Sequence, residues 1–159
     1  MTNILVLCTG NSCRSVLGEA LFNHLGAGRV KAYSAGSSPI GRTNANAVKT
    51  LKKHGVNTEG FSSQSWDEFE NHKIDIAITV CDNAANEECP VYLNSVVRAH
   101  WGLSDPAHLK GTEAEIDAAF EKTYVVMEAR VKKMLALSFE DFSAEQLTEE
   151  LNKIGKTDD

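Results

Sequence analysis

Four short apolar runs mark the chain, and the segments between them repeat their apolar residues at helical spacing. We expect the runs to form β-strands at about residues 3–8, 30–34, 74–80 and 96–101. The periodic segments predict helices at about 15–25, 44–54 and 113–137, and a last helix that starts at Ser143. Between the second helix and the third strand, residues 60–73 are typical of a loop with one short helix.

Capping residues sharpen two of the predicted helix boundaries. Thr43 is a candidate N-cap for the second helix, and Gly55 follows its last turn. Ser143 and Gln146 have the spacing of a capping box at the start of the last helix. Strands that alternate with helices predict an α/β fold, a single domain over 1–159 with a four-stranded parallel sheet and helices on both faces.

Composition narrows the class of protein. The 159 residues are 42% hydrophobic and 24% charged, as in an ordinary globular domain, and the net charge is −6. This acidic balance argues against nucleic acid or an anionic membrane as the main partner. No apolar run approaches the ~18–20 residues of a membrane span, and the start of the chain lacks the pattern of a signal peptide. We therefore expect a cytoplasmic protein, where its four cysteines are reduced and available for chemistry.

The most informative motif follows the first strand. Residues 8–15 read Cys-Thr-Gly-Asn-Ser-Cys-Arg-Ser, a Cys-x5-Arg motif at a strand-to-helix turn. In such a turn, loop N–H groups and the helix N-terminus can bind an oxyanion, and the Arg14 fork can hold two of its oxygens. The same positive field should lower the pKa of Cys8 and make it a nucleophile. The oxyanion-binding residues predicted here are Thr9, Gly10, Asn11, Ser12, Cys13, Arg14 and Ser15.

Three of these loop residues have individual expectations. Asn11 tolerates the left-handed conformation and can hold the loop through its side-chain amide. Cys13 should point into the body of the protein as a small apolar residue. Ser15 can donate a hydrogen bond to the Cys8 thiolate. The alternative for the whole motif is a buried structural cysteine beside a surface arginine.

Asp105 and Pro106 follow the fourth strand. Active sites of parallel sheets lie at the carboxyl ends of the strands, where Cys8, Cys81 and the segment 101–105 are all expected. Chemistry on an oxyanion needs an acid to protonate the departing oxygen, so we predict that role for Asp105. The alternative is an Asp-Pro turn on the surface.

Cys81 directly follows the third strand, and Cys89 lies eight residues later, after a polar, turn-prone segment. One thiol fixed at a strand end and a second on a polar loop are typical of a redox pair. A metal site would need His100 and His108 as further ligands, and no Cys-x2-Cys pair supports it. Two bystander thiols are the remaining alternative.

Taken together, these motifs resemble the arsenate reductases that share the low-molecular-weight protein tyrosine phosphatase fold. The resemblance covers nearly the whole chain, with a polar C-terminal extension at about 139–159 beyond the shortest members. It is carried by residues 8–15, Tyr-Ser-Ala-Gly at 33–36, Thr-Val-Cys-Asp at 79–82, Cys-Pro at 89–90, and His-Trp-Gly-Leu-Ser-Asp-Pro at 100–106.

The resemblance implies a role for each matching residue. Cys8 is the nucleophile, Arg14 the oxyanion clamp, Asp105 the general acid, and Cys81 with Cys89 the relay pair whose final disulfide is reduced from outside. Arsenate is then the substrate and thioredoxin the reductant, with glutaredoxin and glutathione as the other possibility. The resemblance also implies a monomer with no resident cofactor.

Some relatives bind potassium through residues that match Asn11, Glu19 and Ser34 together with an acidic side chain. Gln64 stands at that acidic position in this chain, so we predict no metal site.

Two further functions use the same residues. A phosphomonoester hydrolase, such as a phosphotyrosine phosphatase, needs the loop and Asp105 but neither Cys81 nor Cys89. A thiol-based sensor explains the cysteines but leaves Arg14 and Asp105 without a role. The presence of both relay cysteines makes arsenate reduction the main expectation.

Overall fold

The computed structural model describes residues 1–81, 90–93 and 96–156. The strands are β1 (Thr2–Leu7), β2 (Val30–Ala35), β3 (Ile76–Thr79) and β4 (Val97–His100), and the α-helices are α1 (Arg14–Leu25), α2 (Ala45–Lys53), α4 (Glu113–Leu135) and α5 (Ala144–Gly155). Short 3-10 helices cover Trp66–Phe69, Val91–Leu93, Pro106–His108 and Phe139–Asp141. Every predicted strand and helix is present, with ends within about two residues of the prediction.

The strands form one parallel sheet in the order β2-β1-β3-β4. Its register pairs Leu7 with Ala35 on one side and with Thr79 on the other, and Thr79 with His100. All four strands therefore end at the same level. The residues that follow them in the sequence are brought to one edge of the sheet, as predicted for an α/β fold.

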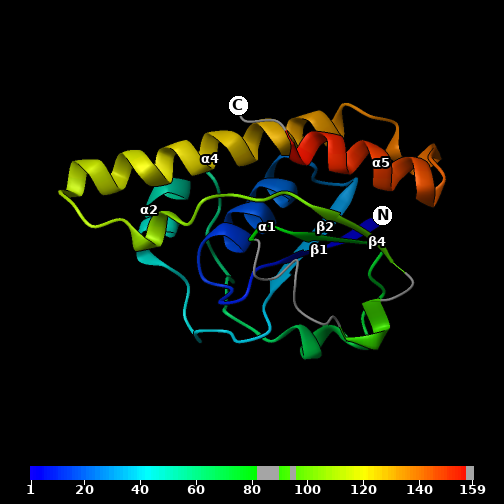
Figure 1. Ribbon diagram of the computed structural model, residues 1–159, viewed down its shortest axis with the longest axis horizontal. Helices are drawn as coiled ribbons and strands as arrows, with labels where there is room; N and C mark the ends of the chain where they lie inside the picture. Colours follow the sequence, from blue (N-terminus) through cyan, green and yellow to red (C-terminus); the bar gives the residue numbers. More distant parts are fainter. Residues whose placement is uncertain (82–89, 94–95, 157–159) are drawn as a thin grey trace.

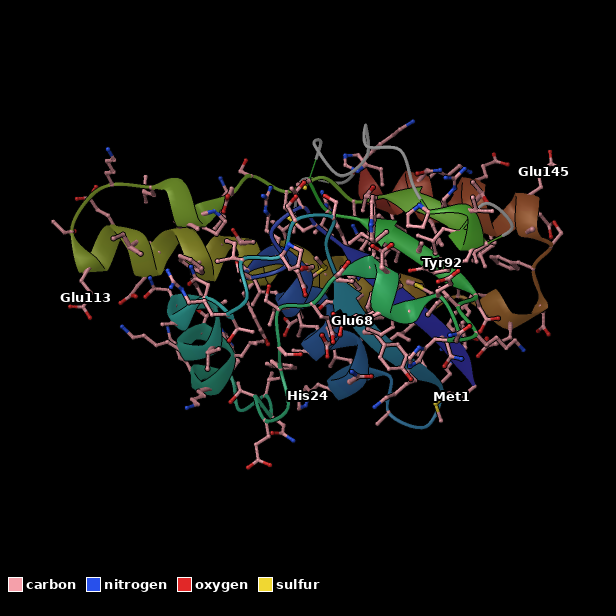
Figure 2. The ribbon with its side chains drawn as sticks, turned by 90° about the horizontal axis from the view of Figure 1, so that it is seen from below. Met1, His24, Glu68, Tyr92, Glu113 and Glu145 are labelled. Carbon is pink, nitrogen blue, oxygen red and sulfur yellow. The ribbon has the colours of Figure 1, made fainter. Side chains whose placement is uncertain are left out.

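The two faces of the sheet carry different layers (Figure 1). On one face α1, α4 and α5 cover Ile4, Val6 and the β3 residues Ile76 and Ile78 in the larger core. On the other face, the 3-10 helices at 66–69 and 91–93 supply Trp66, Phe69 and Leu93 to a smaller core. Figure 2, seen from below, shows Tyr92 and Glu68 of these short helices on that side.

The predicted cap of α2 is wrong by one residue. Asn44, not Thr43, is the N-cap, and its side-chain oxygen accepts hydrogen bonds from the N–H groups of Asn46 and Ala47. Thr43 and Asn44 are both good capping residues, so local sequence cannot choose between them. The capping box of Ser143 and Gln146 is confirmed at the start of α5.

Helix α5 closes the open edge of the sheet at β4. The His100 N–H donates to the side-chain oxygen of Asn152 at 3.1 Å, and the Trp101 indole donates to the Leu151 carbonyl at 2.8 Å. A Cβ on Gly155 would lie 2.2 Å from the His100 carbonyl oxygen, so only glycine allows this approach. Helix α5 is thus fastened to the strand that leads into the Asp105 segment.

Candidate active site

The loop after β1 takes its shape from hydrogen bonds to its carbonyl groups. The Thr9 carbonyl accepts from Ser38 N–H, and the Ser12 carbonyl accepts from Asn44 N–H at 2.7 Å. The Gly10 carbonyl accepts from the Ile40 N–H at 3.0 Å and from the Ser63 hydroxyl at 3.1 Å. In a trans peptide the N–H points opposite to the C=O, so the N–H groups of residues 10, 11 and 13 point to the other side. These groups are the predicted oxyanion donors.

Asn11 fastens this loop from within, as predicted. It is fully buried, with φ of 44°. Its amide nitrogen donates to the Ser15 hydroxyl at 2.9 Å, and its oxygen accepts from the Gln64 N–H at 2.7 Å. The Ser15 hydroxyl is thus engaged behind the loop, and among the described residues it makes no hydrogen bond to Cys8. The expected Ser15–Cys8 contact is therefore wrong.

Gly36 brings the end of β2 against the same loop. A Cβ at this position would lie 2.3 Å from the carbonyl oxygens of both Cys8 and Thr9. Its N–H donates to the Gln64 carbonyl, and its carbonyl accepts from Trp66 N–H. Segment 64–66 is thereby held beside β2 and supports the loop through main-chain bonds. The sequence does not reveal this support, because main-chain contacts do not depend on residue type.

The N-terminus of α1 faces the site without a competing side chain. The N-cap residue is Cys13, which makes no side-chain capping hydrogen bond, and the first turn has no acidic residue. The first N–H groups of a helix have no partner within it and carry partial positive charge. The helix start therefore adds to the positive potential of the loop.

A single cavity of about 560 Å³ joins the predicted groups. It is lined by residues 8–14, Ile40, Cys81, Leu103, Ser104 and Asp105. Arg14 donates to the Leu103 carbonyl at 2.9 Å, and its Nη2 lies 3.4 Å from Oδ2 of Asp105. Asp105 accepts from Ala107 N–H at 2.9 Å, which caps the short helix after Pro106. The residues predicted to act as nucleophile, clamp and acid thus share one site.

Cys81 lies in the same cavity wall as Cys8. It is buried just after the end of β3, its sulfur lies 3.8 Å from the Thr9 hydroxyl, and it lines the cavity together with Cys8. Cys89, predicted as its relay partner, lies outside the described residues.

The contact with Cys81 changes the expected acidity of Cys8. The Cys81 thiol and burial raise the pKa of Cys8, whereas Arg14 and the Gly10 N–H lower it, and the net direction is upward. The prediction of a lowered pKa is wrong for this arrangement, because the sequence does not show that two thiols meet. A charge on Cys81 disfavours a second charge on Cys8.

Cys13 agrees with its predicted passive role. It is 5% exposed, and burial, followed by the charge of Asp105, raises its pKa to about 12. Its thiol is therefore protonated at neutral pH and is a poor nucleophile.

The residues that match the potassium ligands of some relatives are occupied with one another. The Ser34 hydroxyl donates to Glu19 at 2.5 Å, and the Gln64 amide nitrogen donates to the Ser34 carbonyl at 3.0 Å. Burial raises the pKa of Glu19, which weakens it as an anionic ligand. A neutral amide donor thus takes the place of a carboxylate, and this set does not fit a potassium ion. In residues 1–81, 90–93 and 96–156, no three His, Cys, Asp or Glu side chains gather to hold a metal.

The described structure also bears on two possibilities considered from the sequence, a membrane span and a metal site that includes His100. No helix among the described residues is both long and apolar enough to span a membrane. His100, considered above as a metal ligand, has its Nδ1 2.8 Å from the Thr79 hydroxyl and lies at the α5 edge of the sheet.

Comparison with known proteins identifies the family. The family model of low molecular weight phosphotyrosine protein phosphatases matches residues 3–153. An arsenate reductase of Bacillus licheniformis is 40% identical over 131 residues, which cover 82% of this chain and 92% of that protein. An arsenate reductase of Bacillus subtilis is 38% identical over 130 residues, again 82% of this chain and 92% of the relative. The solved structure of an arsenate reductase in a phosphate-binding state has a TM-score of 0.71 at 24% identity, covering 86% of this chain and 98% of that one. The chain therefore belongs to the low molecular weight phosphotyrosine protein phosphatase family, and within it to the arsenate reductases.

Proposed function

We propose that this protein reduces arsenate through a relay of Cys8, Cys81 and Cys89, and that thioredoxin resets the relay. One observation carries the proposal: Cys8 and Cys81 line the same cavity, which also holds Arg14 and Asp105, and Cys81 is near enough to raise the pKa of Cys8. A nucleophile that meets an oxyanion and a second thiol in the same cavity can form a bond to arsenic and then lose it to a disulfide.

In the first step, the Cys8 sulfur attacks arsenic while the loop N–H groups and Arg14 hold the oxygens. A sulfur–arsenic bond forms, and a hydroxyl leaves as water with a proton from Asp105. The Cys8 proton passes to an arsenate oxygen as the bond forms, since the pKa of Cys8 is raised in the substrate-free arrangement.

In the second step, the Cys81 thiol gives its proton to an arsenic-bound oxygen, and its sulfur attacks the Cys8 sulfur. The sulfur–arsenic bond breaks, and its electron pair stays on arsenic, which becomes arsenite while Cys8 and Cys81 become a disulfide. Cys89 then attacks Cys81, frees Cys8, and leaves a Cys81–Cys89 disulfide. An external dithiol takes that oxidation away. Thioredoxin is proposed because a two-cysteine disulfide suits a dithiol reductant; glutaredoxin with glutathione is the alternative.

Phosphomonoester hydrolysis is the second candidate, because the family model describes phosphatases and the Cys8–Arg14–Asp105 set is sufficient for it. The buried Cys81 argues against it as the main activity. A phosphatase gains nothing from a thiol that raises the pKa of its nucleophile.

The test is arsenite production by the purified protein with either the thioredoxin or the glutaredoxin system. Cys81→Ser should form the Cys8 adduct in a single turnover and release no arsenite. Cys89→Ser should complete one turnover and trap a Cys8–Cys81 disulfide. Hydrolysis of an aryl phosphate should survive both changes, while Cys8→Ser, the matched control, should abolish both activities. Repeated turnover of arsenate by Cys81→Ser would contradict the relay.

A further inference from the structure

A second cavity lies directly behind the segment that carries Asp105. It measures about 440 Å³ and separates this segment from α4. Leu103, Asp105 and Pro106 line it on one side, and Thr123, Val126 and Arg130 of α4 line it on the other. Leu103 and Asp105 also line the cavity of Cys8, so the segment is a partition between two spaces. A partition without close packing behind it needs anchors to hold a fixed position.

Arg130 is one such anchor. It lies on the buried stripe of α4, between Met127 and Met134, and is only 3% exposed. Its Nη1 donates to the Gly102 carbonyl at 3.0 Å across the second cavity. Burying a guanidinium in an apolar stripe is costly, so a leucine or methionine would serve packing alone better. Packing alone therefore does not explain an arginine at this position, and its bond to the Gly102 carbonyl suggests a role in holding the segment.

Arg14 is the other arginine that binds this segment, and its contacts with the segment depend on whether an anion occupies the Cys8 cavity. It binds the neighbouring carbonyl, Leu103, and contacts Asp105. Both contacts use the guanidinium that is proposed to clamp the oxyanion, and an anion competes with Asp105 for Nη2. Arg130 lines the second cavity and is not among the described residues that line the cavity of Cys8, so its bond to Gly102 is not in competition with substrate.

We propose that Arg130 is a positioning residue that keeps Asp105 aimed at the leaving oxygen while Arg14 is engaged by the substrate. It touches neither substrate nor reacting atoms, and acts through the Gly102 carbonyl, three residues before the acid. The inference rests on the proposed role of Asp105 as general acid, and it adds a group outside the Cys8 cavity to that role.

The experiment compares two aryl phosphates whose leaving groups differ in their need for an acid. 4-Nitrophenyl phosphate expels a stable phenolate, whereas phenyl phosphate expels a basic one that must be protonated. Arg130→Met should lower kcat/KM for phenyl phosphate at least ~10-fold more than for the nitrophenyl ester, as a partial loss of the ~10²–10⁴-fold value of general acid catalysis. Lys122→Met, which removes a cation lining the same cavity, should leave the ratio of the two substrates unchanged.

A double variant separates positioning from general weakening. Asp105→Asn should show the same substrate-selective loss, and adding Arg130→Met to it should cost little more, because the acid that Arg130 aims is already absent. The two single variants and the double variant are also compared in single-turnover formation of the Cys8–arsenic adduct. Both single variants should slow this step, and the rate of the double variant should match that of Asp105→Asn.

Each outcome is decisive. Equal losses on both esters, or a full additional loss in the double variant, would overturn the proposal and leave Arg130 a structural residue. If Arg130→Met does not fold, Arg130→Lys is measured instead. A lowered ratio of kcat/KM for phenyl phosphate to kcat/KM for 4-nitrophenyl phosphate supports positioning, and an unchanged ratio overturns it. If Asp105→Asn itself shows no selective loss, the assigned acid fails and the positioning role of Arg130 fails with it; if Asp105→Asn shows the selective loss and Arg130→Met does not, only the role of Arg130 is overturned.

Discussion

Two arginines at opposite ends of the sheet show that the same residue type can either stabilise the fold or line the candidate active site. Arg29 lies between α1 and β2, and its guanidinium makes hydrogen bonds, an ion pair and a contact with an aromatic ring. It donates to the carbonyls of Leu135 and Leu137, pairs with Glu140 through two nitrogens, and lies 4.3 Å above the centre of the Phe139 ring. It joins the start of β2 to the end of α4 and the 3-10 helix after it, and its donors are committed to the protein.

Arg14, at the other end, is held more loosely. Among the described residues it donates to one carbonyl, that of Leu103, and has one longer contact, 3.4 Å, with Asp105. Its side chain is 15% exposed and lines the Cys8 cavity. A guanidinium whose N–H donors all bind groups of the protein stabilises the fold. One that faces a cavity and has further N–H donors available can bind a ligand. Changes at the two ends should therefore separate activity from stability.

The largest effect is expected for Arg14→Lys. Lysine keeps the charge but lacks the planar fork that holds two oxygens, so most arsenate reduction and aryl phosphate hydrolysis should be lost. The melting temperature should change little, since only the bond to the Leu103 carbonyl and the longer contact with Asp105 are affected in the fold. Steady-state kinetics and a thermal melt give both quantities. A near-normal kcat/KM would show that charge alone is sufficient at this position.

Asp105→Asn should come next. Loss of the acid should slow adduct formation by ~10²–10⁴-fold, while phosphate still binds as a competitive inhibitor. Asp117→Asn, which changes an exposed carboxylate of α4 that pairs with Lys49 of α2, is the matched control and should leave the rate unchanged. An unaltered single-turnover rate in Asp105→Asn would reduce Asp105 to a cap of the short helix after it.

The opposite pattern is expected at the other end of the sheet. Arg29→Ala leaves two carbonyls and Glu140 to water, and it should lower the free energy of unfolding by roughly 1–2 kcal/mol. The kcat of the folded protein should stay unchanged. Urea denaturation measures the loss, and Arg42→Ala, an exposed arginine, should show almost none. A large loss of activity without loss of stability would contradict the contrast between the two arginines.

The smallest effect should be in the pH dependence of stability. The Arg29 hydrogen bond lowers the pKa of Glu140 from 4.5 to about 2. A lowered carboxyl pKa stabilises the fold fully above the ordinary value, and this contribution is lost as the pH falls from about 4.5 towards 2. Thermal melts of Glu140→Gln should therefore fall less steeply in this window than those of the parent, while Glu145→Gln, an exposed residue of α5, should follow the parent. Parallel melting curves for Glu140→Gln and the parent would contradict the assigned pairing.

The sequence predicted most where chemistry is local. Cys8 and Arg14 belong to one turn, and their spacing alone predicts a shared cavity. Asp105 and Cys81 could be placed because parallel strands end at one edge of the sheet. Contacts between a side chain and a main-chain group escaped prediction: Asn11 accepts from the Gln64 N–H and Arg14 donates to the Leu103 carbonyl, and neither main-chain group requires a particular residue type at its own position. The raised pKa of Cys8 escaped as well, because it depends on how closely two distant thiols approach.

The α5 extension has a consequence for how this protein behaves at high concentration. An edge strand offers a row of unpaired peptide groups on which a strand from another copy can add. At β4 that row is interrupted, because Asn152 takes the His100 N–H and the backbone at Gly155 lies against its carbonyl. The same helix that fastens the entrance to the acid segment thus also blocks growth of the sheet by a second copy, and a chain cut before Ser143 would expose both at once.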